Sequence, residues 1–539
     1  MKAHLRCTVA FVPFLLAASA IAAAEEDSCQ KLTGLAIPDV KIIFAQPVNA
    51  GDFAGPRTPN SGRDLTAPYK NVPAFCRVVA IAKPKPDSEI RLEVWLPLAG
   101  WNGKLQGLGN GGFAGQIEYL GLGAAVTKGY TATATDAGHQ GSPGDASWAR
   151  GHPEKVTDFG HRGIHEMTLV AKATVNAFYG KNAQRSYFVG CSDGGREALM
   201  EAQRYPADYD GILAGDPANN WTPLFATAVS DTQALTLDPA SFIPPMKIPA
   251  ISAAVLAACD ELDGVRDGIL NDPRSCHFDP AIMQCKAGED TDQCLTALQA
   301  VALKKIYAGL RDAKGRELFP GFLPGAEDGP GGWGLWITGP TPGKSAASIL
   351  GLGFFSNMVY EDSTWNYKTF TVEGGLKAEE EKTANAVDAV NANLGAFKAR
   401  GGKLIMYHGW NDPAIPALST VNYYESVVAQ MGQRDVDSFL RLYMVPGMQH
   451  CYNGPGADSF GQFGRLPNDD PQHSADAALE QWVETGTAPA AIIASKYSSD
   501  DRQHPKMTRP LCVYPQAAKY KGSGDTNDAA NFVCEAPKK

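Results

Sequence analysis

Hydrophobic and polar positions alternate early in the chain in the way that a half-buried strand requires. Residues 90–97, Ile-Arg-Leu-Glu-Val-Trp-Leu-Pro, have this period of two and predict a strand with one face on a core. Short runs at 105–108 and 129–136 predict two more strands. The first of them leads directly into a glycine loop, Gly-Asn-Gly-Gly, at 109–112.

Beyond residue 160, helical and extended patterns follow one another in turn. The patterns predict helices at 163–173, 196–204 and 421–431, a helix that ends at 400, and strands at 186–189, 211–215, 403–408 and 440–445. Such alternation is typical of a mainly parallel sheet covered by helices. The rhythm is lost from about 219 to 388, where clustered cysteines, an Asp-rich loop and a Gly/Pro/Trp-rich stretch indicate one large insertion.

The first residues of the chain have the pattern of a signal peptide. Lys2 and Arg6 precede an apolar run at 9–20, which closes on three alanines at 22–24 before an acidic segment. The run is too short for a spanning helix, which needs about 20 apolar residues. We therefore expect cleavage of residues 1–24 and a secreted or periplasmic protein; an uncleaved membrane anchor is the alternative.

Composition limits the class of protein. With 539 residues, 44% of them hydrophobic, the chain is long enough to bury a large core and to form two structural units. The formal net charge of -10 is spread over scattered carboxylates without a basic stripe. We therefore expect neither a nucleic acid nor a membrane as a partner.

The cysteine count supports export. Removing Cys7 with the signal peptide leaves ten, and an even number in an exported chain predicts disulfides. Spacing alone leaves the connectivity open, although the couples 259/276, 285/294 and 512/534 would each close a short loop. The absence of a CxxC pair disfavours zinc.

A candidate nucleophile lies between a predicted strand and a predicted helix. Gly190-Cys191-Ser192-Asp193-Gly194 is a G-x-S-x-G motif in the context that this motif requires. Small flanking residues are needed because the serine occupies a strained turn at which strand and helix approach closely. The alternative is an ordinary glycine turn with a solvent-facing serine.

An acid and a base follow the serine in the order Ser, Asp, His. Asp412 follows the strand at 403–408, and His450 follows the strand at 440–445. His408 and Asp458 are the competing candidates. Ser192 and His450 each have a cysteine neighbour, Cys191 and Cys451, and a bond between those cysteines would carry the two catalytic residues together.

The chain resembles the tannase and feruloyl esterase family of α/β-hydrolases over essentially its whole mature length. The segments that carry the resemblance are 159–167, 187–196, 408–412, 447–451 and 520–525. The resemblance implies an α/β-hydrolase fold, a mainly parallel sheet flanked by helices, with a large inserted lid domain. The catalytic domain would comprise 25–218 and 389–539, and the lid 219–388.

The resemblance also implies a complete set of disulfides, in which the cysteine before the serine bonds the one after the histidine. The implied pairs are Cys191–Cys451, Cys29–Cys76, Cys259–Cys276, Cys285–Cys294 and Cys512–Cys534.

Within the predicted lid, residues 260–269 resemble the structural calcium loop of the family. The implied ligands are the side chains of Asp260, Asp263 and Asp267 and the carbonyls of Val265 and Ile269. Ca²⁺ takes six to eight oxygen ligands, which such a loop can supply. The spacing is not that of an EF-hand, and a solvated acidic turn is the alternative.

The predicted chemistry is serine ester hydrolysis through an acyl-enzyme on Ser192, without an organic cofactor. Two backbone N–H groups are expected to stabilise the oxyanion. One belongs to Asp193, and the other comes from the glycine loop, with Gly112 as the first choice and Gly111 as the second. The Asp193 carboxylate is expected to point away from the oxyanion, since a negative charge there would oppose the reaction.

The expected substrate is a small aromatic ester of hydroxycinnamoyl or galloyl type, as plants contain. Six lid aromatics are candidates to contact it, although most should be lid core: Trp333, Trp336, Phe354, Phe355, Tyr360 and Trp365. Family members that hydrolyse mono(2-hydroxyethyl) terephthalate use a lid arginine, whereas this chain has only Lys344 between 317 and 367. Acyl transfer to a sugar or alcohol would use the same triad, and a non-catalytic, calcium-dependent binding protein is a hypothesis from a different class.

Overall fold

A computed structural model describes residues 27–56, 66–462 and 470–536, so the predicted signal peptide lies outside the described residues. The strands of its main sheet are β1 (Val40–Val48), β2 (Phe75–Ala82), β3 (Ile90–Pro97), β4 (Lys104–Leu108), β5 (Thr131–Thr135), β6 (Arg185–Cys191), β7 (Gly211–Gly215), β10 (Lys403–Gly409) and β11 (Leu440–Val445). They lie in the order β1-β2-β3-β5-β4-β6-β7-β10-β11. From β5 to β11 in that order every pair is parallel, and β1, β2 and β3 add an antiparallel edge. The predicted, mainly parallel sheet is confirmed.

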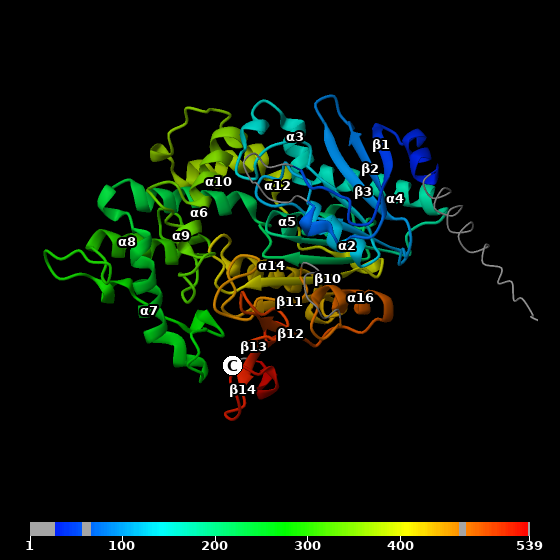
Figure 1. Ribbon diagram of the computed structural model, residues 1–539. Helices are drawn as coiled ribbons and strands as arrows, with labels where there is room; N and C mark the ends of the chain where they lie inside the picture. Colours follow the sequence, from blue (N-terminus) through cyan, green and yellow to red (C-terminus); the bar gives the residue numbers. More distant parts are fainter. Residues whose placement is uncertain (1–26, 57–65, 463–469, 537–539) are drawn as a thin grey trace, which may run out of the picture.

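Helices cover both faces of this sheet (Figure 1). One face carries α4 (Gly163–Tyr179), α5 (Asp193–Arg204) and α14 (Ala417–Met431), and the other carries α2 (Tyr119–Thr127) and α16 (Ala475–Thr485). Successive residues of a strand point to opposite faces. In β10, Leu404 and Met406 therefore join the first core, and Ile405 and Tyr407 the second.

Two differences from the predicted elements have local causes. Helix α5 begins at Asp193 and not at 196, because the chain turns into the helix immediately after Ser192. Helix α2 escaped prediction, since two of its nine residues are glycines, which disfavour helix. Packing of Leu122, Ala125 and Val126 into the second core stabilises it nevertheless.

The chain between β7 and β10 leaves the sheet and forms a separate group of helices. They include α6 (Trp221–Thr236), α7 (Ile248–Cys259), α8 (Ala297–Ala308), α9 (Trp333–Trp336), α10 (Ala346–Phe354) and α11 (Val372–Glu379). Figure 1 shows them, mostly in green, gathered at the left of the view. Where the segment enters and leaves, the Ala389 N–H donates to the Asn219 carbonyl at 2.8 Å. The insertion interrupts the chain but not the sheet, because β7 and β10 pair directly. The limits 219–388 for a lid domain stay a prediction.

One stretch of the described residues, Pro239–Asp263, is long and apolar enough to cross a membrane, with a mean hydropathy of 1.6. It is divided into short 3₁₀ turns and the 12-residue helix α7. Ile243, Ile248 and Ile251 pack into an apolar cluster with residues of α8 and with Trp333. This packing is that of a core segment of the insertion, and the expected lack of a membrane partner stays a prediction.

Five disulfides cross-link the described residues. They are Cys29–Cys76, Cys191–Cys451, Cys259–Cys276, Cys285–Cys294 and Cys512–Cys534. The pairing implied by the family resemblance is therefore confirmed. It uses all ten cysteines that remain after Cys7.

Candidate active site

Ser192 occupies a strained turn between β6 and α5. Its φ is +67°, in a region that non-glycine residues rarely adopt. A Cβ on Gly190 would lie 2.3 Å from the Gly194 carbonyl oxygen, and one on Gly195 would lie 2.3 Å from that of Gly215. Only glycine fits at these positions, which confirms the predicted close approach of strand and helix.

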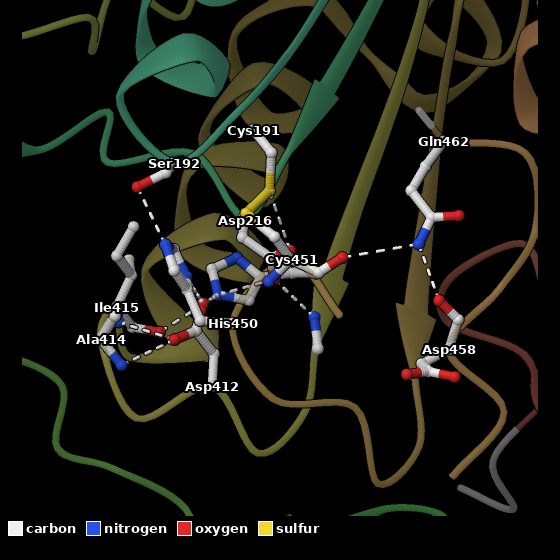
Figure 2. The surroundings of a disulfide bond; sticks show 12 residues. Cys191, Ser192, Asp216, Asp412, Ala414, Ile415, His450, Cys451, Asp458 and Gln462 are labelled. Carbon is white, nitrogen blue, oxygen red and sulfur yellow. Dashed lines mark hydrogen bonds and ion pairs between the residues drawn. A yellow bond between two sulfur atoms is a disulfide. The ribbon is translucent and has the colours of Figure 1, made fainter. Parts of the chain in front are cut away.

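The structure brings the three predicted triad residues together from three strand ends (Figure 2). His450 Nε2 lies 2.9 Å from Ser192 Oγ, and His450 Nδ1 lies 2.7 Å from Asp412 Oδ2. The other oxygen of Asp412 accepts the backbone N–H groups of Ala414 and Ile415 at 2.7 and 3.0 Å. One oxygen of the carboxylate is thus fixed by the backbone, and the other orients the imidazole.

The pKa values of Asp412 and His450 are shifted in opposite directions. Burial alone would raise the pKa of Asp412, but the attraction of His450 and hydrogen bonds from His408 and His450 lower it below its ordinary value. Burial alone would lower the pKa of His450, but the charge of Asp412 and its hydrogen bond raise it. An ionised Asp412 therefore stabilises the imidazolium that forms when His450 takes a proton.

The two competing candidates do not face Ser192. His408 is completely buried, with Nδ1 2.7 Å from Thr420 Oγ1 and Nε2 3.2 Å from Asp412 Oδ2. Asp458 accepts the Asn453 N–H at 2.7 Å and pairs with Lys496 at 3.1 Å. His408 thus contacts the catalytic acid on the side away from Ser192. Asp458 stabilises the loop that contains Asn453.

The Cys191–Cys451 disulfide lies directly behind the serine and the histidine. Figure 2 shows it joining the residue before Ser192 to the residue after His450. The two cysteines are 260 residues apart in sequence and both are buried. This bond therefore connects the nucleophile and base loops covalently.

The glycine loop after β4 packs on the start of α5. The Gly194 N–H donates to the Asn110 carbonyl at 2.8 Å, and the Asn110 N–H donates to Glu197 Oε2 at 2.8 Å. Gly112 has a φ of +57°, and a Cβ there would lie 2.4 Å from the Pro143 carbonyl oxygen. Gly111 and Gly112 line the same cavity as Ser192.

The side chain of Asp193 is held away from the site by a buried arginine. As the first residue of α5, its N–H has no acceptor within the helix. Its buried carboxylate accepts a hydrogen bond from Arg196 Nε at 2.6 Å, and Arg196 also donates to the Phe159 carbonyl at 3.0 Å. The carboxylate is directed away from the cavity, as expected.

A cavity of about 800 Å³ opens in front of Ser192 and His450. Its apolar and aromatic walls come from α2, the insertion and the base loop, and include Leu120, Leu335, Trp336, Ile349, Leu350 and Tyr452. The Trp336 ring meets the His450 ring edge-on, with centroids 5.0 Å apart. Of the other five lid aromatics, Trp333, Phe354 and Phe355 are buried in the insertion and Trp365 packs half-buried against the same region, as expected of lid core, whereas Tyr360 is exposed.

Two residues of the site were not predicted. Asp216, at the end of β7, contacts the acid and base loops. Gln449 donates from Nε2 to the carbonyls of Ala326 and Asp328 at 2.8 and 2.7 Å, which ties the base loop to the insertion. A carboxylate directly after a parallel strand was the available signal for Asp216, because such strand ends meet at one edge of the sheet.

The acidic loop after α7 has features that suit a cation. Asp263, Val265, Asp267 and Ile269, four of the five predicted calcium ligands, line one small cavity. Burial raises the pKa of Asp263 and of Asp267, and the negative charge of Asp260 adds to both. A dication between these groups would relieve that repulsion.

Two contacts already fix parts of this loop. Asp260 is buried and accepts the Gly268 N–H at 3.0 Å. Asp267 Oδ2 lies 2.6 Å from Arg509 Nη2, which links the loop to the C-terminal strand β13 (Met507–Cys512). The chemistry of the donor set therefore fits calcium, with Asp267 shared between the loop and an arginine.

The sheet, the strained serine turn and the Ser-Asp-His arrangement define an α/β-hydrolase. The sequence profile of "Tannase and feruloyl esterase" matches residues 76–535. The chain belongs to the tannase and feruloyl esterase family and is a carboxylic ester hydrolase. The hypothesis of a non-catalytic binding protein is therefore not retained.

Similar proteins are found in bacteria and fungi. An uncharacterised esterase of Xanthomonas campestris is 41% identical over 560 residues, with 99% of this chain and 95% of that protein covered. A probable feruloyl esterase B-1 of Aspergillus flavus is 32% identical, with 97% and 98% covered. The crystal structure of feruloyl esterase B from Aspergillus oryzae matches with a TM-score of 0.85 at 27% identity, covering 95% of this chain and 100% of that one.

Proposed function

We propose that the protein is an exported serine esterase that hydrolyses aromatic esters of feruloyl or galloyl type through an acyl-enzyme on Ser192. The observation that carries the proposal is the Ser192–His450 pair at the wall of a cavity of about 800 Å³ with apolar sides. Apolar walls with a few convergent polar groups are typical of sites for small organic ligands. Relatives named feruloyl esterase support the aromatic acyl group.

In the proposed mechanism, His450 Nε2 accepts the Ser192 proton as Oγ attacks the ester carbonyl. The N–H groups of Asp193 and Gly112 stabilise the oxyanion, each worth about 10²- to 10³-fold in rate. His450 then protonates the leaving alcohol. Water activated by the same nitrogen releases the acid and restores Ser192, so the reaction needs no organic cofactor.

The charge of the cavity favours an uncharged aromatic ester over one with a free carboxylate. Among the described residues that line the cavity, those from the insertion are Pro330, Gly331, Leu335, Trp336, Ala346, Ile349 and Leu350, and none is basic. Lys128, directly after α2, lies 3.9 Å from Asp476, so its charge is already balanced. This arrangement argues against mono(2-hydroxyethyl) terephthalate, whose carboxylate would need a cation.

Calcium is proposed as a structural ion of the loop at 260–269. Asp260, Asp263 and Asp267 would hold it with their carboxylates, and Val265 and Ile269 with their carbonyls. Calcium supplies no chemistry to the ester; its double charge would offset the repulsion among three neighbouring carboxylates. The loop connects α7 to the C-terminal strands through Arg509, so the ion would stabilise the attachment of the insertion.

Export is the remaining part of the proposal. Five disulfides in one chain are typical of an oxidising compartment, either the periplasm or the exterior of the cell. They support the signal peptide expected at residues 1–24.

The test is a comparison of kcat/KM for methyl ferulate, methyl gallate and mono(2-hydroxyethyl) terephthalate with purified mature protein. The proposal expects ferulate or gallate to exceed the terephthalate ester by at least about tenfold. Preference for the terephthalate ester would contradict it. Esterase activity on aliphatic esters alone would keep the triad and refute the aromatic substrate.

A further inference from the structure

A second buried carboxylate lies behind the triad. Asp216 immediately follows β7 and is completely buried. Its φ of +35° lies in the left-handed region, which non-glycine residues rarely adopt. Its own N–H donates to the Tyr407 carbonyl at 2.9 Å, which holds this conformation against β10.

The two oxygens of this carboxylate serve two different catalytic loops. Oδ1 accepts the N–H of Gly409, the last residue of β10 and three residues before Asp412, at 2.7 Å. Oδ2 accepts the N–H of Cys451, the neighbour of His450, at 3.1 Å. Figure 2 shows Asp216 beside the disulfide, among the groups that converge behind the triad. One side chain therefore joins the acid loop and the base loop to the end of β7.

The nucleophile is attached to the same strand end. The Ser192 N–H donates to the carbonyl of Gly215, the residue before Asp216, at 3.0 Å. The carbonyl of Ser192 in turn accepts the Ala218 N–H at 3.1 Å. All three catalytic loops thus meet at residues 215–218.

A histidine connects Asp216 to the catalytic acid. His408 Nε2 lies 3.5 Å from Asp216 Oδ1 and 3.2 Å from Asp412 Oδ2. Its other nitrogen is held at 2.7 Å by Thr420 Oγ1. The imidazole therefore lies between two buried carboxylates whose like charges would otherwise repel each other.

We propose that Asp216 is a positioning residue of the esterase: its carboxylate holds Asp412 and His450 in register with Ser192. The inference rests on the proposed function only in taking Ser192 and His450 as the reacting pair. A displacement of about 1 Å in such a site can cost about 100-fold in rate. Binding of the ester does not involve Asp216, which is absent from the described residues that line the cavity.

The role requires a carboxylate and not merely a side chain of its size. An asparagine has one acceptor oxygen, and its amide nitrogen would face the second backbone N–H, donor against donor. Asp216→Asn therefore leaves either Gly409 or Cys451 without an acceptor in a buried site. The Cys191 sulfur lies 3.4 Å from Oδ2, but it is bonded to Cys451 and carries no proton. It therefore cannot act as a hydrogen-bond donor to this oxygen.

Asp216 also contributes to the charge around the base. The charged groups that face His450 are Asp412 and Asp216, with His408 behind them. Burial raises the pKa of Asp216 itself, whereas the attraction of His408 and His450 and the hydrogen bond from the Gly409 N–H favour its ionised form. The negative charge of Asp216 raises the pKa of His450, so its removal should move the acid limb of kcat/KM to lower pH.

The test compares Asp216→Asn with a matched control, Asp208→Asn. Asp208 is also buried and hydrogen-bonded, with Oδ2 2.6 Å from His165 Nδ1, but it precedes β7 at the opposite end of the strand. Both variants are assayed for kcat, KM, thermal unfolding and the second-order rate of Ser192 labelling by a fluorophosphonate. Hydrogen exchange is followed at the amides of Gly409 and Cys451.

Asp216→Asn is expected to lower kcat and the labelling rate about 10- to 100-fold, with KM within about twofold of the wild type. Its acid limb should move to lower pH, and one of the two amides should exchange faster. Asp208→Asn should lower the unfolding temperature and leave kcat within about twofold. If Asp216→Asn is not recovered folded, Asp216→Glu, which displaces the carboxylate by one methylene, should show the same loss of kcat.

The inference is overturned if folded Asp216→Asn keeps kcat and the acid limb of the wild type. It is equally overturned if both aspartate variants lose activity only in proportion to their unfolded fraction. A wild-type protein that hydrolyses no aromatic ester but is labelled at Ser192 would refute the proposed substrate alone. The labelling rates would still decide the role of Asp216.

Discussion

Removing the Cys191–Cys451 disulfide should affect catalysis more than any other disulfide of the chain. We expect Cys191→Ala/Cys451→Ala to lower kcat at least about 100-fold, because the cysteines adjoin Ser192 and His450 and release of either loop misplaces the pair. Such a loss corresponds to about 2.7 kcal/mol of transition-state stabilisation. The backbone N–H of residue 451 can still donate to Asp216 in the variant. The variant should therefore fold, with a base loop that is more mobile but still bound to the end of β7.

The loss of stability can be separated from the loss of activity. In the loop-entropy model, a bond that closes 260 residues contributes up to about 5.6 kcal/mol, and one that closes 9 residues about 2.6 kcal/mol. Cys285→Ala/Cys294→Ala, which opens the short loop of the insertion, is therefore the control. Both variants are melted and then assayed with an aromatic ester well below their unfolding temperatures.

The control should lose stability and keep kcat within about twofold. The reasoning is refuted if folded Cys191→Ala/Cys451→Ala, with the other eight bonded cysteines showing no free thiols, turns over at the wild-type rate.

Three further predictions concern the acid, the base and the ion. Asp412→Asn should lower kcat about 10⁴-fold at an unchanged fold, because the amide no longer selects the productive tautomer of His450; a loss below tenfold in steady-state kinetics would contradict this. Burial lowers the pKa of His450 and Asp412 raises it more, so the net pKa lies above its ordinary value and kcat/KM should fall with decreasing pH through that raised pKa. A pH profile without a single-proton acid limb would be inconsistent with His450 as the base. Chelation with EGTA should lower the unfolding temperature of the wild type but not of Asp263→Asn, whose loop has lost a ligand; equal shifts, or none, in calorimetry would argue against the ion.

The framework of the site could be predicted from sequence because it depends on local rules. The G-x-S-x-G motif needs its glycines wherever strand and helix meet, and Asp412 and His450 each follow a recognisable strand. The disulfide pairs could not be derived from spacing, since ten cysteines allow many connectivities. They came from resemblance to a family, and the structure agrees with that resemblance.

What escaped prediction depends on contacts between distant segments. The place of Asp216 directly after a strand indicates the catalytic edge of the sheet, but only the position of β7 between β6 and β10 shows that it lies beside Gly409 and Cys451. His408 was a competing candidate for the base because it lies at the end of a strand, as His450 lies after one. Only the contact of His408 with Thr420 shows that its ring points into the core. Helix α2 forms against its glycine content through burial on the sheet.

The central claim is that Ser192 carries the acyl group of an aromatic ester. The most direct measurement is rapid acid quenching of the protein during turnover of methyl ferulate, followed by peptide mass spectrometry of the wild type beside Ser192→Ala. The account predicts a feruloyl adduct on the peptide that contains Ser192, which disappears in the variant together with hydrolysis. Turnover that persists in Ser192→Ala, or an adduct on another residue, would contradict the account.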